Sequence, residues 1–358
     1  MRITIAVALL VACNRTEPKP KAEPAPKTAD YCRARNTYTA VPGELGSASG
    51  SAIRPAHTFS IVARDPTTGE LGVAVQSHWF SVGGLVTWAE PGVGAVATQS
   101  FVEPSYGPNG LALMRGGTSA PDAMAQLIAK DAQSAVRQLG FIDAAGHAAS
   151  HTGAKCIQFA GSHVGNGFAV QANLMGNDKV VPAMTAAYEG AKGDLADRLL
   201  AALDAGQAVG GDIRGCQSAA ILVVSGDKSA PAWQRKLDLR VEDSPDPIVE
   251  LRRLVVLARA YDHMNQGDAA IEKNDMAGAV THYGTAAKLV PDNAEMVYWQ
   301  AVALAGHGQV DAALPLFKKA FAADSAWVEL THRLIAPGII PDTPAGHAAV
   351  ERVLREAK

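Results

Sequence analysis

Alternating apolar and polar positions begin abruptly at Thr58. Side chains of the two kinds alternate through 58–64 (TFSIVAR), which is the period of a β-strand. The next residues, 65–69 (DPTTG), have the composition of a tight turn. A second strand-like run follows at 71–77 (LGVAVQS). The sequence therefore predicts a β-hairpin over 58–77.

The pattern predicts several more elements before residue 245. Strands are expected at 92–100, 136–143, 168–175, 218–224 and 236–242, and helices at 120–133 and 178–206. Ser119 and Asp122 resemble a capping box at the start of the first helix. Strands and helices occur in separate blocks, which favours a layered α+β fold over a parallel βαβ sheet.

After the Pro245-Asp246-Pro247 break the pattern is helical to about residue 333. Small and aromatic residues recur there at a period of about 34 residues, as they do in tetratricopeptide repeats, which these copies resemble. The recurring residues are Ala279, Tyr283 and Ala286, then Ala313, Phe317 and Ala320. Helices at 247–265 and 326–335 are expected to cap the repeats or to contact the preceding domain. The region is interpreted as a groove for peptide or protein partners, or equally as a packing appendage or a contact in a homo-oligomer.

The first residues have the features of a secretion signal. Arg2 precedes an apolar run, and residues 10–13 (LVAC) resemble a bacterial lipobox, in which Cys13 becomes lipidated. Asn14 after that cysteine resembles the outer-membrane sorting pattern of lipoproteins, so we expect a cell-envelope protein facing the periplasm or the exterior. The alternative is an apolar leader with an incidental cysteine. Residues 14–28 are rich in Pro and Lys and are expected to act as a tether.

These features divide the chain into four parts. They are a signal over 1–13, a tether and flexible segment over 14–56, an α+β domain over 57–245 and a helical domain over 246–358. The whole chain has 358 residues with 48% hydrophobic and 19% charged residues, a globular composition. Its net charge of -3 and its 6% aromatic residues argue against nucleic-acid partners. No apolar run approaches the length of a transmembrane helix.

The four cysteines have no zinc-type spacing, because no CxxC pair exists. With Cys13 lipidated, three thiols remain, among them Cys32. Cys156 and Cys216 both fall in the predicted compact domain, and they form either a disulfide or two buried unpaired thiols. We expect no metal site and no cofactor, since acidic partners for the scattered histidines are missing and no phosphate-binding loop occurs.

Several long segments resemble the uncharacterised family known as domain of unknown function 1028. They appear in order as 57–83, 92–101, 106–117, 167–175, 211–224 and 238–254. The resemblance covers 57–260. It implies a four-layer αββα sandwich like that of the N-terminal-nucleophile (Ntn) hydrolases, whereas the activity of the family is not settled.

The resemblance assigns the role of nucleophile to Thr58, the first residue of the first strand. Ntn enzymes use the side chain of their first residue as nucleophile and its own α-amine as base. His57 precedes Thr58 here, so a cut between these two residues is required. The alternative is a β-branched residue that merely begins a strand.

Further candidate residues follow the predicted strands. His78 and Asn173 are candidate catalytic groups, for proton transfer and for stabilising an oxyanion. Thr98 and Gln99 end the third strand and could donate or accept hydrogen bonds in a cleft, and Gln99 is a candidate substrate-binding residue. The glycine-rich loop 210–218 contributes Asp212 as a further catalytic candidate, and Arg214, Gln217 and Ser218 as candidate substrate-binding groups. For each residue a structural role is an alternative: a packed histidine, a buried amide, a sheet-end cap or an Asp–Arg pair that stabilises the turn.

Two functions are consistent with these features. The first is a surface-anchored Ntn-type amidohydrolase of a small amide substrate. The second is a non-catalytic ligand-binding or scaffold lipoprotein that uses the same cleft and the helical repeats.

Overall fold

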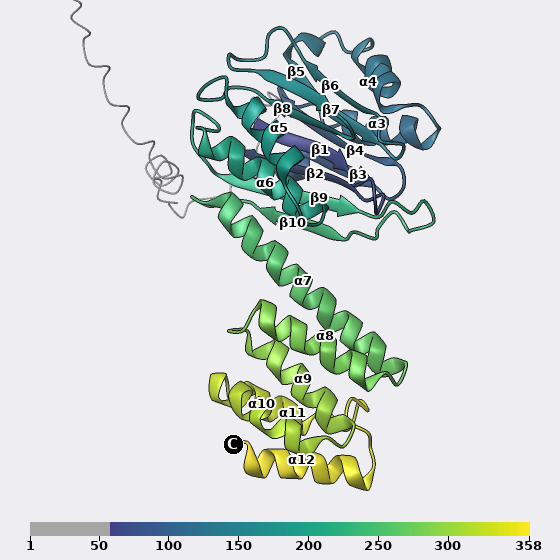
Figure 1. Ribbon diagram of the computed structural model, residues 1–358, viewed down its shortest axis with the longest axis vertical. Coiled ribbons are helices and arrows are strands. Elements are labelled where there is room, and N and C mark those ends of the chain that lie inside the picture. Colours follow the sequence, from purple (N-terminus) through teal and green to yellow (C-terminus); the bar gives the residue numbers. More distant parts are fainter. Residues whose placement is uncertain (1–57) are drawn as a thin grey trace, which may run out of the picture.

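The computed structural model describes residues 58–358. It contains a mixed α+β region with two antiparallel sheets, followed by an all-helical region that extends away from it (Figure 1). The predictions for the signal, the tether, Cys13 and Cys32 lie outside the described residues. Within 58–358, no helix combines the length and the apolar character needed to cross a bilayer.

The larger sheet has six strands and is built around the predicted hairpin. Its order is β10 (Leu237–Val241), β9 (Ser218–Val224), β2 (Leu71–Ser77), β1 (Thr58–Arg64), β8 (Phe168–Ala172) and β7 (Gly161–Gly165). β1 and β2 pair antiparallel with Thr58 opposite Ser77, which confirms the hairpin. β1 is therefore a central strand, with β8 as its other neighbour.

The smaller sheet has four strands and packs face to face against the larger one. Its order is β3 (Thr87–Glu90), β4 (Gly94–Ser100), β5 (Arg137–Asp143) and β6 (Ala148–Thr152). The prediction covered β4 and β5 but missed β3, β6 and, in the larger sheet, β7. These three strands have four or five residues and are only partly buried, so their apolar alternation is weak.

Helices cover the outer faces of both sheets (Figure 1). α3 (Tyr106–Arg115) and α4 (Ala120–Ile128) lie on the smaller sheet, and α5 (Val180–Gly190) and α6 (Leu195–Ala208) lie on the larger one. A four-residue helix, α2 (Gly83–Val86), precedes β3. The layer order is thus helix, sheet, sheet, helix.

Two of the helix predictions need correction. The single helix expected over 178–206 is two helices, because the chain turns at Gly193, whose φ is +106°. Asp194 then caps α6 by accepting a hydrogen bond from the N–H of Asp197 (2.9 Å). The expected start of α4 is confirmed, since the side chain of Ser119 accepts from the N–H of Asp122. α4 ends earlier than predicted, at Ile128.

α3 was not predicted, because its glycines and proline conceal the helical pattern. Close packing explains the glycines. A Cβ at Gly107 would lie 2.2 Å from the ring of Trp88, and one at Gly110 would lie 2.5 Å from the ring of Phe141. The helix therefore approaches the smaller sheet more closely than side chains at these positions would allow.

The all-helical region begins at Pro247, which occupies the first turn of its helix. It contains α7 (Pro247–Glu272), α8 (Met276–Leu289), α9 (Ala294–Gly306), α10 (Val310–Ala323), α11 (Ala326–His332) and α12 (Pro344–Glu356). The six residues of the 34-residue echo are all buried. α12 lies beyond the predicted helices, and α7 is longer than predicted.

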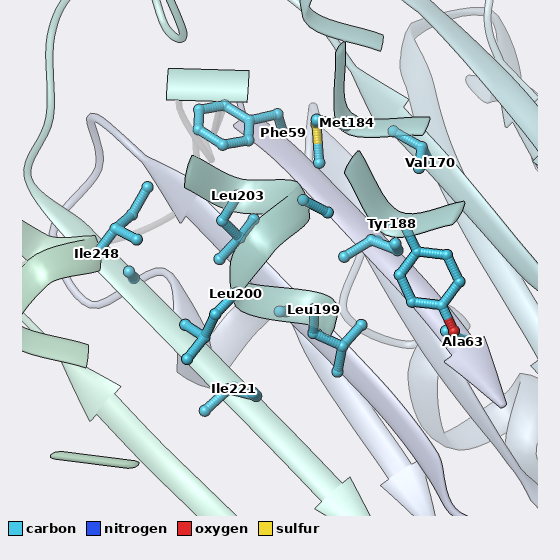
Figure 2. Close-up of a cluster of buried hydrophobic side chains, with 14 of the residues drawn as sticks. Phe59, Ala63, Val170, Met184, Tyr188, Leu199, Leu200, Leu203, Ile221 and Ile248 are labelled. Carbon is cyan, nitrogen blue, oxygen red and sulfur yellow. The ribbon is translucent and has the colours of Figure 1, made fainter. Parts of the chain in front are cut away.

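An apolar core fills the space between the larger sheet and its helices (Figure 2). Phe59 and Ile61 project from β1 toward α6, whose Leu199, Leu200 and Leu203 are fully or almost fully buried. Removing this surface from water stabilises the fold by about 1.5–3 kcal/mol per large side chain. The core therefore holds β1 in place from its outer side.

The interface between the two sheets is apolar at one end and polar at the other. Val62, Val73 and Ile142 belong to the apolar end. The polar end contains Thr58, Ser60, Ser77, Gln99, Gln138, Gln171 and Asn173, each with 0% of its surface exposed. Buried polar groups are costly unless they are hydrogen-bonded to one another.

A hydrogen-bond network across the two sheets satisfies most of these groups; we call it the inter-sheet network. Ser60 Oγ donates to Gln99 Oε1 (2.5 Å) and accepts from Gln171 Nε2 (2.7 Å). Gln99 Nε2 and Asn173 Nδ2 both donate to Gln138 Oε1, at 2.8 and 2.7 Å. Gln138 Nε2 donates in turn to a backbone carbonyl oxygen of β8 (2.8 Å). Gln99 and Gln138 on the smaller sheet thus both bind partners on the larger sheet.

Leu199 provides a test of the outer core. We expect Leu199→Ala to lower the free energy of unfolding of the α+β region by about 2–5 kcal/mol, because it leaves a cavity against β2. Urea denaturation measures the change. Val249→Ala, at a position 67% exposed on α7, is the control and should change the value by less than about 0.5 kcal/mol. Equal effects of the two substitutions would contradict the assignment of the core.

Gln138 provides a test of the inter-sheet network. Gln138→Met keeps the size of the side chain but removes the oxygen to which one N–H of Gln99 and one N–H of Asn173 donate. We expect a loss of about 2–4 kcal/mol in unfolding free energy, since each orphaned buried donor costs about 1–3 kcal/mol. Gln126→Met, on the exposed face of α4, is the matched control. A loss below about 1 kcal/mol for Gln138→Met would show that the network contributes little.

Candidate active site at the leading end of β1

Thr58 lies at the leading end of the central strand, fully buried between the sheets. Its Oγ1 donates a hydrogen bond to Ser77 Oγ across the β1–β2 pair (3.2 Å). Its carbonyl oxygen accepts from the backbone N–H of Asn173 and from Gln99 Nε2, both at 3.1 Å. Hydrogen bonds to neighbouring strands thus hold both the hydroxyl and the carbonyl of Thr58.

Gln99 and Asn173, two predicted site residues, lie beside Thr58 as parts of the inter-sheet network. The amide of Asn173 approaches the Thr58 carbonyl oxygen at 3.5 Å while it donates to Gln138. Both amides therefore orient the backbone of Thr58. Thr98 lies on the other face of β4, where its hydroxyl donates to the carbonyl oxygen of Glu103 (3.1 Å).

Sequence reasoning missed three residues of this site. Ser77 is the partner of the Thr58 hydroxyl, and Gln138 and Gln171 complete the network. Each is a polar residue at an inward position of a strand whose other inward positions are apolar. These exceptions to the apolar alternation indicated a buried polar site in the sequence, because a hydroxyl or an amide at an inward position needs a hydrogen-bond partner.

Asp212 is fully buried and forms an ion pair with Arg214, whose side chain is 28% exposed. The guanidinium donates to both carboxylate oxygens, from Nη2 (2.7 Å) and Nε (3.0 Å). Asp212 also accepts from the backbone N–H of His78 (3.2 Å). The Asp212 carboxylate thus connects the loop after β2 to the loop before β9. The Arg214 guanidinium is paired with this carboxylate.

Backbone pairing brings this loop to the end of the sheet that carries Thr58. Asp212 forms an isolated β-bridge with Met175, just beyond β8. Gly210 and Gly215 have φ values of +127° and +114°, which side chains rarely allow, so the glycines are needed for this path. The loop therefore lies within the same cluster of strand ends as Thr58.

Gln217 directly precedes β9, and Ser218 is its first residue and lies opposite Ser77. The N–H of Gln217 donates to the carbonyl oxygen of Ser77 (3.1 Å). Ser218 Oγ donates to the carbonyl oxygen of Trp79 (2.5 Å) and accepts from the N–H of Val82 (3.2 Å). Ser218 thus fixes the segment after β2.

His78 directly follows Ser77 and is partly buried. Its Nδ1 is buried and has no hydrogen-bond partner within the described part of the chain. The imidazole follows the strand residue that is hydrogen-bonded to Thr58, and its Nδ1 is enclosed by protein.

Neither expectation for Cys156 and Cys216, a shared disulfide or two unpaired thiols, is correct. Cys156 has a free thiol, whereas Cys216 is disulfide-bonded, so the two are not paired with each other. Cys156 Sγ donates to the carbonyl oxygen of Arg137 (3.4 Å). Burial raises the pKa of the Cys156 thiol. A thiol of this kind carries little thiolate and is a poor nucleophile.

The scattered histidines have local partners. His147 Nδ1 lies 3.0 Å from Asp143 Oδ2, and His151 Nε2 lies 2.9 Å from the carbonyl oxygen of Ser134. Among residues 58–358, no group of three or more His, Cys, Asp or Glu side chains is placed to hold a metal ion.

Comparison with known proteins identifies the α+β region. None of the curated proteins matches the chain. A crystal structure of a protein from Silicibacter pomeroyi, itself assigned to DUF1028, is similar at 33% sequence identity and a TM-score of 0.51. The match covers 56% of this chain and 85% of that protein. The model of the family of unknown function DUF1028 matches residues 58–251, so the chain belongs to that family.

Proposed function

We propose that the protein is an Ntn-type hydrolase that acts on a small amide, with Thr58 as its nucleophile. The observation that carries the proposal is the position of Thr58. It is the first residue of a central strand, its hydroxyl is hydrogen-bonded to Ser77, and its carbonyl is held by two donors. A nucleophile must be held in this way to attack along a defined direction.

The layer order supports the same proposal. Two antiparallel sheets packed face to face, with helices on both outer surfaces, agree with the four-layer αββα sandwich of Ntn hydrolases. In such a sandwich the nucleophile begins a central strand, which is the place that Thr58 has in β1.

The proposed reaction begins once the chain has been cut between His57 and Thr58. The new α-amine of Thr58 accepts the proton of Oγ1, and the oxygen attacks the carbonyl carbon of the amide. The Asn173 amide or a backbone N–H stabilises the oxyanion. The C–N bond then breaks, the amine leaves with the proton from the ammonium group, and the acyl group stays on Oγ1 as an ester. Water hydrolyses this ester and regenerates Thr58.

The neighbouring residues have supporting roles in this proposal. Asp212, through its bond to the N–H of His78, positions the imidazole near the reacting groups. Arg214, Gln217 and Ser218 shape the loops at the edge of the site, where substrate enters. No cofactor is required, because the nucleophile and the base come from one residue.

We propose further that lipidation of Cys13 anchors the protein to the outer membrane, facing the periplasm or the exterior. The helical region, with its buried 34-residue echo, would act as a tetratricopeptide-like domain that binds a peptide or protein partner. The alternative function is a non-catalytic ligand-binding or scaffold lipoprotein; the full burial of the Thr58 side chain, which argues against catalysis, is the observation that favours it.

Substitution of Thr58 tests the proposed chemistry. Hydrolysis of a panel of small chromogenic anilides is measured for the wild type, Thr58→Ala and Thr58→Ser. We expect Thr58→Ala to reduce kcat/KM by about 10³-fold or more, because the nucleophilic oxygen is lost. Thr58→Ser keeps a hydroxyl and should retain measurable turnover. Thr67→Ala, in the exposed turn at the opposite end of β1, is the matched control.

Two results would overturn the proposal. Turnover by Thr58→Ala equal to that of the wild type would remove Thr58 from the mechanism. Absence of turnover on every anilide, together with saturable binding of the same compounds, would establish the alternative of a binding protein.

A further inference from the structure

The helical region contains a groove that the proposed hydrolase does not use. It encloses about 870 Å³ between α7, α9 and the segment 338–341. This volume lies in the range of about 300–1,000 Å³ that is typical of ligand sites. Its lining includes Tyr261, Asn265, Asp268, Glu272, Glu295 and Trp299.

The charge of the groove has one sign. Asp268 and Glu272 on α7 and Glu295 on α9 line it, and its lining contains no lysine or arginine. Elsewhere in the protein, carboxylates commonly pair with arginine, as Glu250 does with Arg253. Within residues 58–358, none of the three groove carboxylates belongs to an ion pair. The groove therefore presents uncompensated negative charge.

Two tyrosines hold two of these carboxylates in position. The hydroxyl of Tyr261 donates to Glu295 Oε2, and that of Tyr283 donates to Asp268 Oδ1, each at 2.5 Å. The bond to Glu295 raises the pKa of Tyr261, so the phenol remains a donor. Each bond uses one oxygen of its carboxylate. The second oxygen is left to accept from a ligand.

The rest of the lining suits the aliphatic part of a cationic side chain. Trp299 and the two tyrosines supply aromatic rings, and Ile271 and Ile339 supply apolar surface. Ile339 is 48% exposed. Alkylammonium and guanidinium groups combine an apolar stem with a charge that aromatic faces attract. Carboxylates and aromatic rings together thus select a cation over a neutral or anionic ligand.

A peptide fits the groove better than an isolated amine. Tyr261, Asn265, Asp268 and Glu272 recur at intervals of three or four residues, so they lie along one face of α7. The carboxylates are spread over this face and over α9, which allows more than one cation to bind. The amide of Asn265 offers a donor and an acceptor to a peptide backbone.

We propose that this groove binds an extended peptide segment that carries lysine or arginine side chains. The proposal gives a chemical identity to the partner proposed for the helical region. It does not depend on hydrolysis at Thr58, so the Thr58→Ala variant should bind such a peptide as the wild type does.

Calorimetric titration of the full-length protein tests the proposal. The probes are the capped hexapeptide Lys-Ala-Lys-Ala-Lys-Ala, its glutamate counterpart and n-butylammonium chloride. We expect saturable binding of the lysine peptide that weakens as salt is added, because the attraction is electrostatic. The double variant Glu272→Gln/Glu295→Gln should bind it about tenfold or more weakly. The double variant Glu189→Gln/Glu351→Gln makes the same charge change at exposed positions outside the groove and should bind it as the wild type does.

Several outcomes would overturn the proposal. They are no heat of binding for the lysine peptide up to about 1 mM, equal binding of the glutamate peptide, or unchanged affinity in the groove variant. Binding of n-butylammonium as tight as that of the peptide would identify a site for small amines instead. Circular dichroism of both double variants verifies that they are folded, so that weaker binding reports on the groove.

Discussion

The structure depends on how the polar end of the inter-sheet interface is satisfied. Buried amides and hydroxyls there have no access to water, so their hydrogen bonds must come from neighbouring strands of the same sheet or from the opposite sheet. Gln138 accepts from one side chain of its own sheet and from one of the larger sheet, and so connects them. Since Gln99 also donates to the Thr58 carbonyl oxygen, the same bonds that align the sheets set the position of Thr58. Stability and the candidate site are therefore properties of one network.

This arrangement has a consequence for maturation of the chain. β1 is hydrogen-bonded to β2 on one side and to β8 on the other, and Phe59 is buried in the outer core. A cut before Thr58 would therefore leave the strand in its sheet. The new amine would arise beside the hydroxyl that it has to deprotonate, with both held by existing bonds. The helical region beyond Pro247 is outside this network, and none of the residues that line its acidic groove belongs to it.

Local patterns predicted much of the fold, and tertiary contacts decided the rest. The hairpin over 58–77, the cap at Ser119 and the strands β5 and β9 could be predicted, because each carries its own periodicity or capping residues. α3 was missed because its glycines are required by contacts with side chains distant in sequence. The candidate residues were found from strand ends and from family resemblance. Their partner Gln138 was not, because only the packing of two sheets shows that it faces Asn173.

We propose that Thr58 becomes the first residue of the working enzyme. N-terminal sequencing and intact-mass measurement of the purified full-length protein, made on the preparation whose amide turnover is assayed, test it most directly. We expect a polypeptide that begins at Thr58, present in proportion to the activity observed. An active preparation whose backbone is unbroken between His57 and Thr58 would contradict it.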